Sequence, residues 1–269
     1  MVGTRNEALI KEELVRYISS LGVDVKTATK ARGNRGFFKI GRIDVSKTLD
    51  DKSAVRTLVH EFSHYVHYKL DKSLKSLDKV LVEDSQQLRE ELLAVTYFVD
   101  ENSLCNKLNS ESEKLKKSIK TLTCAIKQEY PKFNSGDDLK EFKKYSRWSD
   151  LRYLEKYDRV KIQSLSSDKI YSVTNVRSDF PDIPEVFADY LKLKSDLRKR
   201  AKVSRRISKL NKYYNEPCEL FARFIEGIYI DMERVKTVAP TAFSNFMKMY
   251  GENKYSGMRE VFAILRIII

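Results

Sequence analysis

The chain has 269 residues, of which 42% are hydrophobic and 11% aromatic, which is enough for a sizeable core and excludes a disordered protein. Its 51 basic and 38 acidic residues give a net charge of +13, which favours anionic partners or acidic peptide segments. The three cysteines, Cys105, Cys124 and Cys218, form no C-x-x-C pair, so neither a disulfide framework nor a cysteine zinc site is expected.

The two ends of the sequence predict a soluble, cytoplasmic protein without a membrane span. The N-terminus is charged from Arg5 onward and contains no apolar signal-peptide region. The apolar run 261–269 is too short to cross a bilayer and is interrupted by Arg266.

The N-terminal part of the sequence predicts a helix followed by a small sheet. Residues 6–20 carry apolar side chains at helical spacing, and Gly22 ends that helix. The β-rich runs 23–28 and 37–45 flank a Gly/Asn turn, which indicates a hairpin or a small sheet.

All three histidines lie in one eight-residue stretch, 60–67, which contains the pattern H-E-x-x-H. On a helix, His60 and His64 lie on one face and can bind one metal ion, while Glu61 lies beside the open coordination position. Imidazole nitrogen is a natural zinc ligand. Uncharged residues flank the stretch, and the acidic pair 50–51 precedes it as a helix cap. We therefore expect a buried zinc-binding helix; the alternative is a half-buried helix whose histidines only form hydrogen bonds.

The histidine count restricts the third metal ligand. A catalytic zinc ion keeps three protein ligands and a water molecule. Because there is no fourth histidine, the third ligand must be a carboxylate or, less favourably, His67. His67 lies about two helical turns after His60, which is too far for both to bind one ion. We expect His67 to be a packing residue or an outer partner of the site.

The middle of the chain is predicted to be mainly helical and heavily charged, and the low count of 9 glycines and 5 prolines favours long helices. Apolar spacing predicts helices over 86–98 and 109–130, and Pro131 ends the second one. Two β-rich runs, 159–163 and 169–173, predict a second hairpin.

A long basic helix is predicted over 186–212, after Pro181 and Pro184 break the chain. Its segment 192–212 contains ten basic residues and one acid, Asp196. Such a run is usually a solvated face, but it can also neutralise the phosphates of a nucleic acid.

Two carboxylate clusters compete for the third zinc position. Glu90 and Glu91 lie on the helix that follows the histidines. The second cluster contains Glu219, on a helix over 218–232 that begins with Pro217.

In the second cluster, Glu216, Glu219 and Glu226 share one helical face, so any of them can point inward. Glu219 precedes Ala222, a small residue that lets this helix approach the histidine helix, but Glu91 precedes Ala94 at the same offset. The residues alone leave the choice open.

The histidine motif, combined with the segment Glu219-Leu220-Phe221-Ala222-Arg223-Phe224, resembles the catalytic domain of anthrax lethal factor and related gluzincins, a family of zinc peptidases. The segment 239–246 lies at a similar distance beyond the second motif. The resemblance implies zinc as the cofactor and Glu219 as the third ligand, next to His60 and His64.

The resemblance also implies a catalytic tyrosine a few residues before the third ligand. Tyr213 and Tyr214 are the candidates, although both lie slightly nearer to Glu219 than the family's tyrosine does. The long separation between His64 and Glu219 along the chain implies a large helical insertion.

The expected fold class is α+β and mostly helical, with a zincin-like catalytic core, a small β-sheet and a large helical insertion. Residues 1–70 would form the N-terminal part of the core, 71–210 a mainly helical, basic insertion, and 211–269 the C-terminal part with the third-ligand helix.

The expected function is that of a zinc-dependent endopeptidase acting on a protein or peptide substrate, with Glu61 as the general base. Tyr213 or Tyr214 would stabilise the oxyanion of the reaction. One alternative is a nucleic-acid-binding protein that uses the 192–212 segment. Another is an inert zincin-fold interaction protein, against which the intact Glu61 counts.

Overall fold

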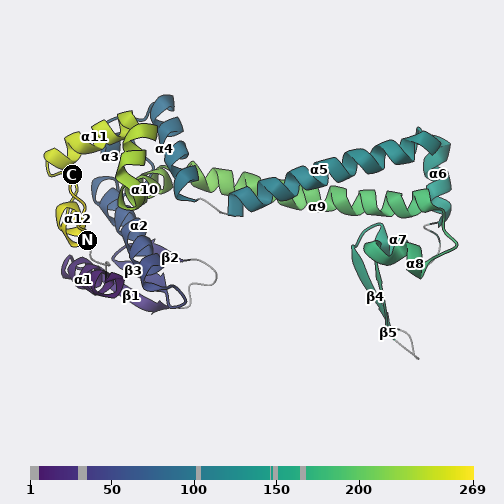
Figure 1. The fold of residues 1–269 in the computed structure, drawn as a ribbon, viewed down its shortest axis with the longest axis horizontal. Coiled ribbons are helices and arrows are strands. Elements are labelled where there is room, and N and C mark those ends of the chain that lie inside the picture. Colours follow the sequence, from purple (N-terminus) through teal and green to yellow (C-terminus); the bar gives the residue numbers. More distant parts are fainter. Residues whose placement is uncertain (1–5, 30–34, 101–103, 146, 148–150, 164–167) are drawn as a thin grey trace. The chain divides into compact units, whose positions relative to one another are not determined.

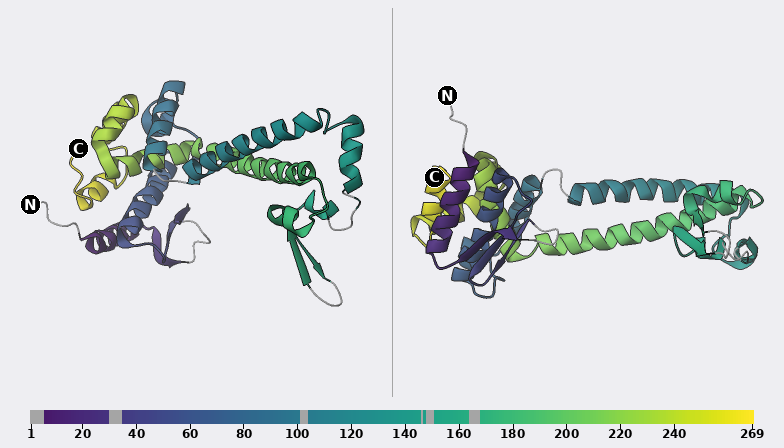
Figure 2. Two further views of the ribbon diagram at one scale, coloured as in Figure 1. Left: turned by 45° about the vertical axis from the view of Figure 1, so that its right-hand side comes forward. Right: turned by 90° about the horizontal axis from the view of Figure 1, so that it is seen from below.

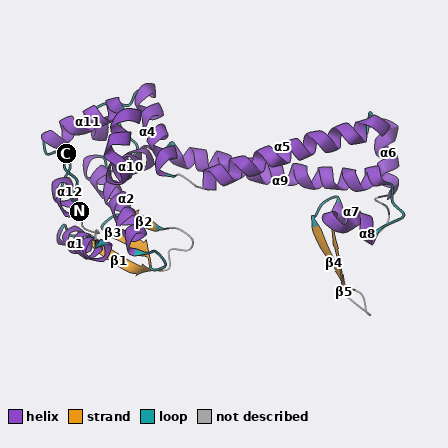
Figure 3. Cartoon of the chain, in the orientation of Figure 1, coloured by secondary structure: helices purple, strands orange, loops and turns teal. Residues whose placement is uncertain are grey.

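The computed structural model of the protein describes residues 6–29, 35–100, 104–145, 147, 151–163 and 168–269. Within these ranges the chain is mostly helical, with a three-stranded and a two-stranded sheet (Figure 1) (Figure 3). The predicted α+β, mostly helical class is thus confirmed. The chain divides into two compact units, the first formed by Met1–Glu101 with Asn211–Ile269 and the second by Asn102–Leu210.

The first unit is built from a small sheet and seven of the described helices. Its elements are α1 (Glu7–Ser20), β1 (Asp24–Thr29), β2 (Gly36–Lys39), β3 (Arg42–Ser46), α2 (Asp51–Leu70), α3 (Asp78–Leu81), α4 (Gln86–Val99), α10 (Pro217–Val238), α11 (Pro240–Gly251) and α12 (Met258–Ile264).

The sheet of the first unit has β3 as its central strand, with β1 parallel to it and β2 antiparallel. The predicted run 37–45 is divided between β2 and β3, because Gly41 adopts the left-handed conformation (φ +77°) that a tight turn needs and glycine tolerates. The hairpin therefore lies within that run, and β1 joins as a parallel neighbour.

Helix α2 is buried on nearly every side. From Ala54 to His67 every residue except Arg56 is buried. The helix begins at Asp50, whose side chain accepts a hydrogen bond of 2.8 Å from the Ser53 amide, as the acidic cap predicts. The helix packs against α1, α10 and the strands β2 and β3. A helix buried on nearly every side must satisfy its buried polar side chains, the histidines among them, within the protein.

Helix α10 packs tightly against both α2 and α4, and it begins with Pro217 as expected. The close approach to α4 occurs at Gly227, where an added methyl group would lie 2.7 Å from Cγ1 of Val95. Because Leu88 and Leu92 of α4 are fully buried in this packing, residues 71–101 belong to the first unit. In this division the second unit begins at Asn102, whereas the sequence led us to expect the insertion to begin at residue 71.

The C-terminal apolar run forms part of α12, which buries Met258, Val261 and Phe262 in the first unit's core. Packing within the fold thus accounts for the apolar side chains at the start of this run, whereas Ile268 at its end is exposed. No helix in the described ranges is long and apolar enough to cross a membrane.

The second unit contains two long helices that lie side by side in all views (Figure 1) (Figure 2). Its elements are α5 (Leu104–Glu129), α6 (Gly136–Tyr145), α7 (Leu151–Leu154), β4 (Arg159–Gln163), β5 (Asp168–Ser172), a short 3-10 helix (Val173–Asn175), α8 (Val176–Asp179) and α9 (Glu185–Tyr214), of which the last turn belongs to the first unit. Strands β4 and β5 form the predicted second hairpin.

The second unit has a hydrophobic core of its own. Phe142 of α6 contacts Tyr190 of α9 at a ring separation of 4.7 Å and Phe187 at 6.0 Å. This aromatic cluster is surrounded by apolar residues of α5, α7 and α8. The unit therefore has the packing of an independent domain.

We predict that Gly227→Ala destabilises the protein by about 1–3 kcal/mol, because the added methyl group overlaps Val95 and forces α10 away from α4. Chemical denaturation measures the change. Gly251→Ala is the matched control: a methyl group added there, in α11, meets nothing within 4 Å, so its stability should equal or slightly exceed wild type. Equal stability of both variants would contradict the tight α4–α10 packing.

Candidate metal centre

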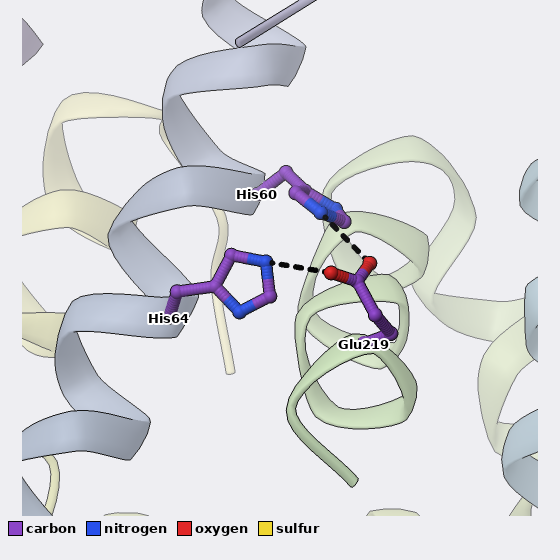
Figure 4. A group of neighbouring side chains, drawn as sticks. All are labelled: His60, His64 and Glu219. Atoms are coloured by element: carbon purple, nitrogen blue, oxygen red, sulfur yellow. Dashed lines mark ion pairs between the residues drawn. The ribbon is translucent and has the colours of Figure 1, made fainter. Parts of the chain in front are cut away.

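Two histidines of α2 and one glutamate of α10 meet in the interior of the first unit (Figure 4). The Nε2 atom of His60 lies 3.4 Å from Oε2 of Glu219, and Nε2 of His64 lies 3.3 Å from Oε1 of the same carboxylate. One ligand atom from each residue lies within 4.8 Å of the others. The helical spacing places both histidines on the face of α2 that packs against α10.

This triad is shielded from water. His60, His64 and Glu219 are 8%, 7% and 6% exposed. Yet Oε2 of Glu219 is a buried oxygen without a hydrogen-bond partner among the described residues. A buried polar atom of this kind normally has a partner. Two imidazoles and a carboxylate form a donor set that suits Zn²⁺, so a metal ion at the centre would satisfy all three residues.

A second carboxylate fixes the orientation of His60. The Nδ1 atom of His60 lies 3.0 Å from Oε2 of Glu226. Glu226 lies about two helical turns after Glu219 on the same face of α10. With its hydrogen on Nδ1, the ring donates to Glu226 and directs the Nε2 lone pair at the centre of the triad. Metal-binding histidines commonly donate their other ring N–H to a carboxylate in this way.

Two arginines form ion pairs with the carboxylate of Glu226. Arg56 of α2 donates to one carboxylate oxygen, and Nη1 of Arg223 lies 3.1 Å from the other. Burial alone would raise the pKa of Glu226, but His60 and these cations lower it to about 2. Glu226 therefore stays ionised in the interior and joins α2 to α10 through Arg56.

The carboxylates around His60 favour its positively charged form. Burial lowers the pKa of His60, but the nearby carboxylates of Glu219 and Glu226 outweigh it and raise the pKa to about 9. Despite its burial, Glu219 has a pKa well below the usual range because both histidines lie against its carboxylate. In the absence of metal, a proton on His60 thus supplies the positive charge that a metal ion would bring.

Glu61 lies beside the triad as a buried carboxylate of α2. It is 6% exposed, and burial raises its pKa. An added methyl group at Gly36 would lie 3.1 Å from Oε1 of Glu61, so the backbone of β2 passes close to this side chain. Glu61 forms no hydrogen bond with another described residue, which leaves its carboxylate free to accept a proton.

The two candidate tyrosines occupy different environments. Tyr213 is 39% exposed and its hydroxyl lies near Glu219; burial and the negative charge of Glu219 raise its pKa. Tyr214 is buried and donates a hydrogen bond to Asp100. Tyr213 is thus the tyrosine whose hydroxyl lies beside the triad, whereas the hydroxyl of Tyr214 binds Asp100.

The other candidate ligands lie elsewhere. Oε2 of Glu91 accepts a hydrogen bond of 3.0 Å from the amide of Ala242, so Glu91 caps the first turn of α11. His67 is fully buried, with Nε2 3.0 Å from the carbonyl oxygen of Ser76 and its ring against Phe221. As expected, His67 is a packing residue.

The sequence did not identify all the residues around the triad. The sequence indicated no role in the site for Arg56 or for Phe38, whose ring stacks on His64 at 6.4 Å. The sequence did predict that Glu226 shares a helical face with Glu219, but it did not predict the contact of Glu226 with His60. One signal was present: Arg56 precedes His60 by four positions, so both lie on one face of α2.

No family model, curated protein or solved structure matches the chain.

We predict that Glu219→Gln lowers zinc affinity by about 10-fold or more, because it replaces an ionised ligand by a neutral one. Competition with a chromogenic chelator measures the affinity. Glu91→Gln is the matched control, since it removes an equal charge from a residue that caps α11. A larger loss of affinity in Glu91→Gln than in Glu219→Gln would show that the third ligand is misassigned.

Proposed function

We propose that the protein is a zinc-dependent endopeptidase with His60, His64 and Glu219 as the metal ligands. The observation that carries the proposal is the convergence of two imidazole nitrogens and one carboxylate in the interior, beside the second buried carboxylate of Glu61. Three protein ligands leave a coordination position open, as a catalytic zinc site requires.

Glu61 supplies the base in this proposal. A bound zinc ion would acidify a water molecule and polarise the scissile carbonyl group. Glu61 accepts the proton of the attacking water and then donates it to the leaving amine. Burial raises the pKa of Glu61, which brings it closer to the value that a general base and acid needs near neutral pH.

Tyr213 supplies a hydrogen-bond donor. Its hydroxyl lies near Glu219 and its raised pKa keeps it protonated, so it can donate to the oxyanion that forms on the carbonyl oxygen. Because its side chain is 39% exposed, a substrate can reach it from the solvent.

The resemblance to gluzincins supports the same assignment. The H-E-x-x-H residues lie on α2 and the segment 219–224 lies on α10. The two helices pack against each other, and α2 also packs against a small sheet. We extend this to a zincin-like core formed by the first unit. Activity in the cytoplasm is part of the proposal, because Cys124 and Cys218 are free thiols.

We predict that Glu61→Gln retains zinc but lowers the rate of peptide hydrolysis by about 100-fold or more, because the amide cannot accept a proton. Cleavage of a random peptide library, detected by mass spectrometry, provides the rate, and elemental analysis provides the zinc content. Glu216→Gln, an exposed position next to Pro217, is the control and should behave as wild type. Zinc-loaded wild type that cleaves no peptide, or cleavage that is unchanged in Glu61→Gln, would refute the proposal.

Replacing each tyrosine by phenylalanine should have different effects on the kinetics of peptide hydrolysis. Tyr213→Phe should lower kcat by about 100-fold with little change in KM, because it removes a donor that acts on the oxyanion. Tyr214→Phe loses the hydrogen bond to Asp100 and should cost about 1 kcal/mol of stability with kcat nearly unchanged. Steady-state kinetics measures kcat and KM of both variants, and denaturation measures their stability. A greater loss of kcat in Tyr214→Phe than in Tyr213→Phe would show that Tyr214 is the catalytic tyrosine.

A further inference from the structure

The second unit carries a groove that is separate from the metal centre. One wall is the segment 156–159, which leads from α7 into β4, and the other is a face of α9. The lining residues are Lys156, Tyr157, Asp158, Arg159, Arg198, Ala201, Lys202 and Arg205. We call this the basic groove.

The wall formed by α9 is a single helical face. Arg198, Lys202 and Arg205 follow one another at intervals of four and three positions, so they lie above one another on that face. Ala201 lies between them and has no long side chain to fill the groove. The basic segment predicted from the sequence thus has a defined concave surface, and the opposite wall adds Lys156 and Arg159.

Little negative charge offsets the cations of the basic groove. Its one acid, Asp158, already binds Arg198 at 2.7 Å. The one acid within 192–212, Asp196, is buried and accepts a hydrogen bond of 2.7 Å from Ser118 of α5, so its charge is not on the surface.

Four cations of the basic groove are therefore available to a ligand. Lys156, Arg159, Lys202 and Arg205 are exposed and form no ion pair with another residue that the structure describes. Two belong to each wall, so the positive charge lines both sides. A ligand that fits must carry negative charges directed to both sides of its chain.

We propose that the basic groove binds an acidic segment of a protein substrate. In an extended peptide, successive side chains point to opposite sides, so consecutive carboxylates would reach both walls. That the segment belongs to a substrate rests on the proposed peptidase function; the binding itself does not. Exposed ion pairs are individually weak and screened by salt, so the affinity comes from several pairs together.

A nucleic acid fits the basic groove less well. A single strand carries its phosphates on one edge and its bases on the other, and bases are bound by stacking on aromatic side chains. In the basic groove the bases would face the cations of the second wall. Tyr157, 58% exposed, is the one aromatic residue among the lining residues.

The test measures binding of a fluorescein-labelled octaglutamate peptide by anisotropy, with an oligothymidylate of equal charge as the second probe. The full-length Glu61→Gln chain is used, so that the result does not depend on catalysis. Lys202→Gln/Arg205→Gln removes the cations of the α9 wall and Lys156→Gln/Arg159→Gln those of the other. Each should weaken octaglutamate binding by about tenfold or more, with the remaining affinity falling at high salt.

The matched control is Arg206→Gln/Lys209→Gln, which removes two exposed charges from α9 outside the basic groove and should bind octaglutamate as wild type does. Equal weakening in all three variants would overturn the proposal, since the binding would then follow net charge alone. Absence of octaglutamate binding, or tighter oligothymidylate binding that the wall variants abolish, would also overturn it. The peptidase proposal fails separately, through the activity of zinc-loaded wild type.

Discussion

The first unit is arranged around a buried carboxylate, that of Glu219, which lies against the two histidines His60 and His64. Two imidazole nitrogens and a carboxylate face one another where water is excluded, and Oε2 of Glu219 has no other partner among the described residues. Removing such groups from water is costly unless a positive charge compensates the carboxylate. A proton can supply that charge, and a divalent metal ion supplies it with bonds to all three residues. The arrangement therefore acts as a strong constraint on the packing of α2 against α10.

The rest of the first unit is organised to satisfy this constraint. Glu226 accepts from His60 and is itself held by Arg56 and Arg223, so an outer layer of charge links the same two helices a second time. Because this network is buried, loss of one member would leave another charge without a partner. On the opposite side of α10, close packing against α4 at Gly227 also fixes the position of the helix. Helix α10 is thus fixed by electrostatics towards α2 and by close packing towards α4.

The end of the insertion, where the chain passes from the second unit back into the first, supplies residues next to the candidate site. The second unit has its own aromatic core, so its packing does not require the metal centre. Its last helix, α9, ends in the first unit with Tyr213 and Tyr214, directly before α10. The hydrogen bond from Tyr214 to Asp100 holds this end of α9, and it leaves Tyr213 on the side of Glu219. The place where the chain re-enters the first unit therefore also supplies a polar group to the candidate site.

The sequence by itself determined the features that depend on local periodicity. The i, i+4 spacing placed His60 and His64 on one helical face, and the apolar spacing located the main helices and the second hairpin. Only the tertiary structure decided which faces meet. Glu91 and Glu219 each precede an alanine by three positions, and it is the packing of α10 on α2, with Glu91 turned to α11, that separates them. Adjacent residues such as Tyr213 and Tyr214 differ by about 100° around a helix, so their environments are set by Glu219 and Asp100, which lie at different places in the chain. A short pattern fixes the direction of a side chain, but its partner comes from long-range packing, which no local pattern encodes.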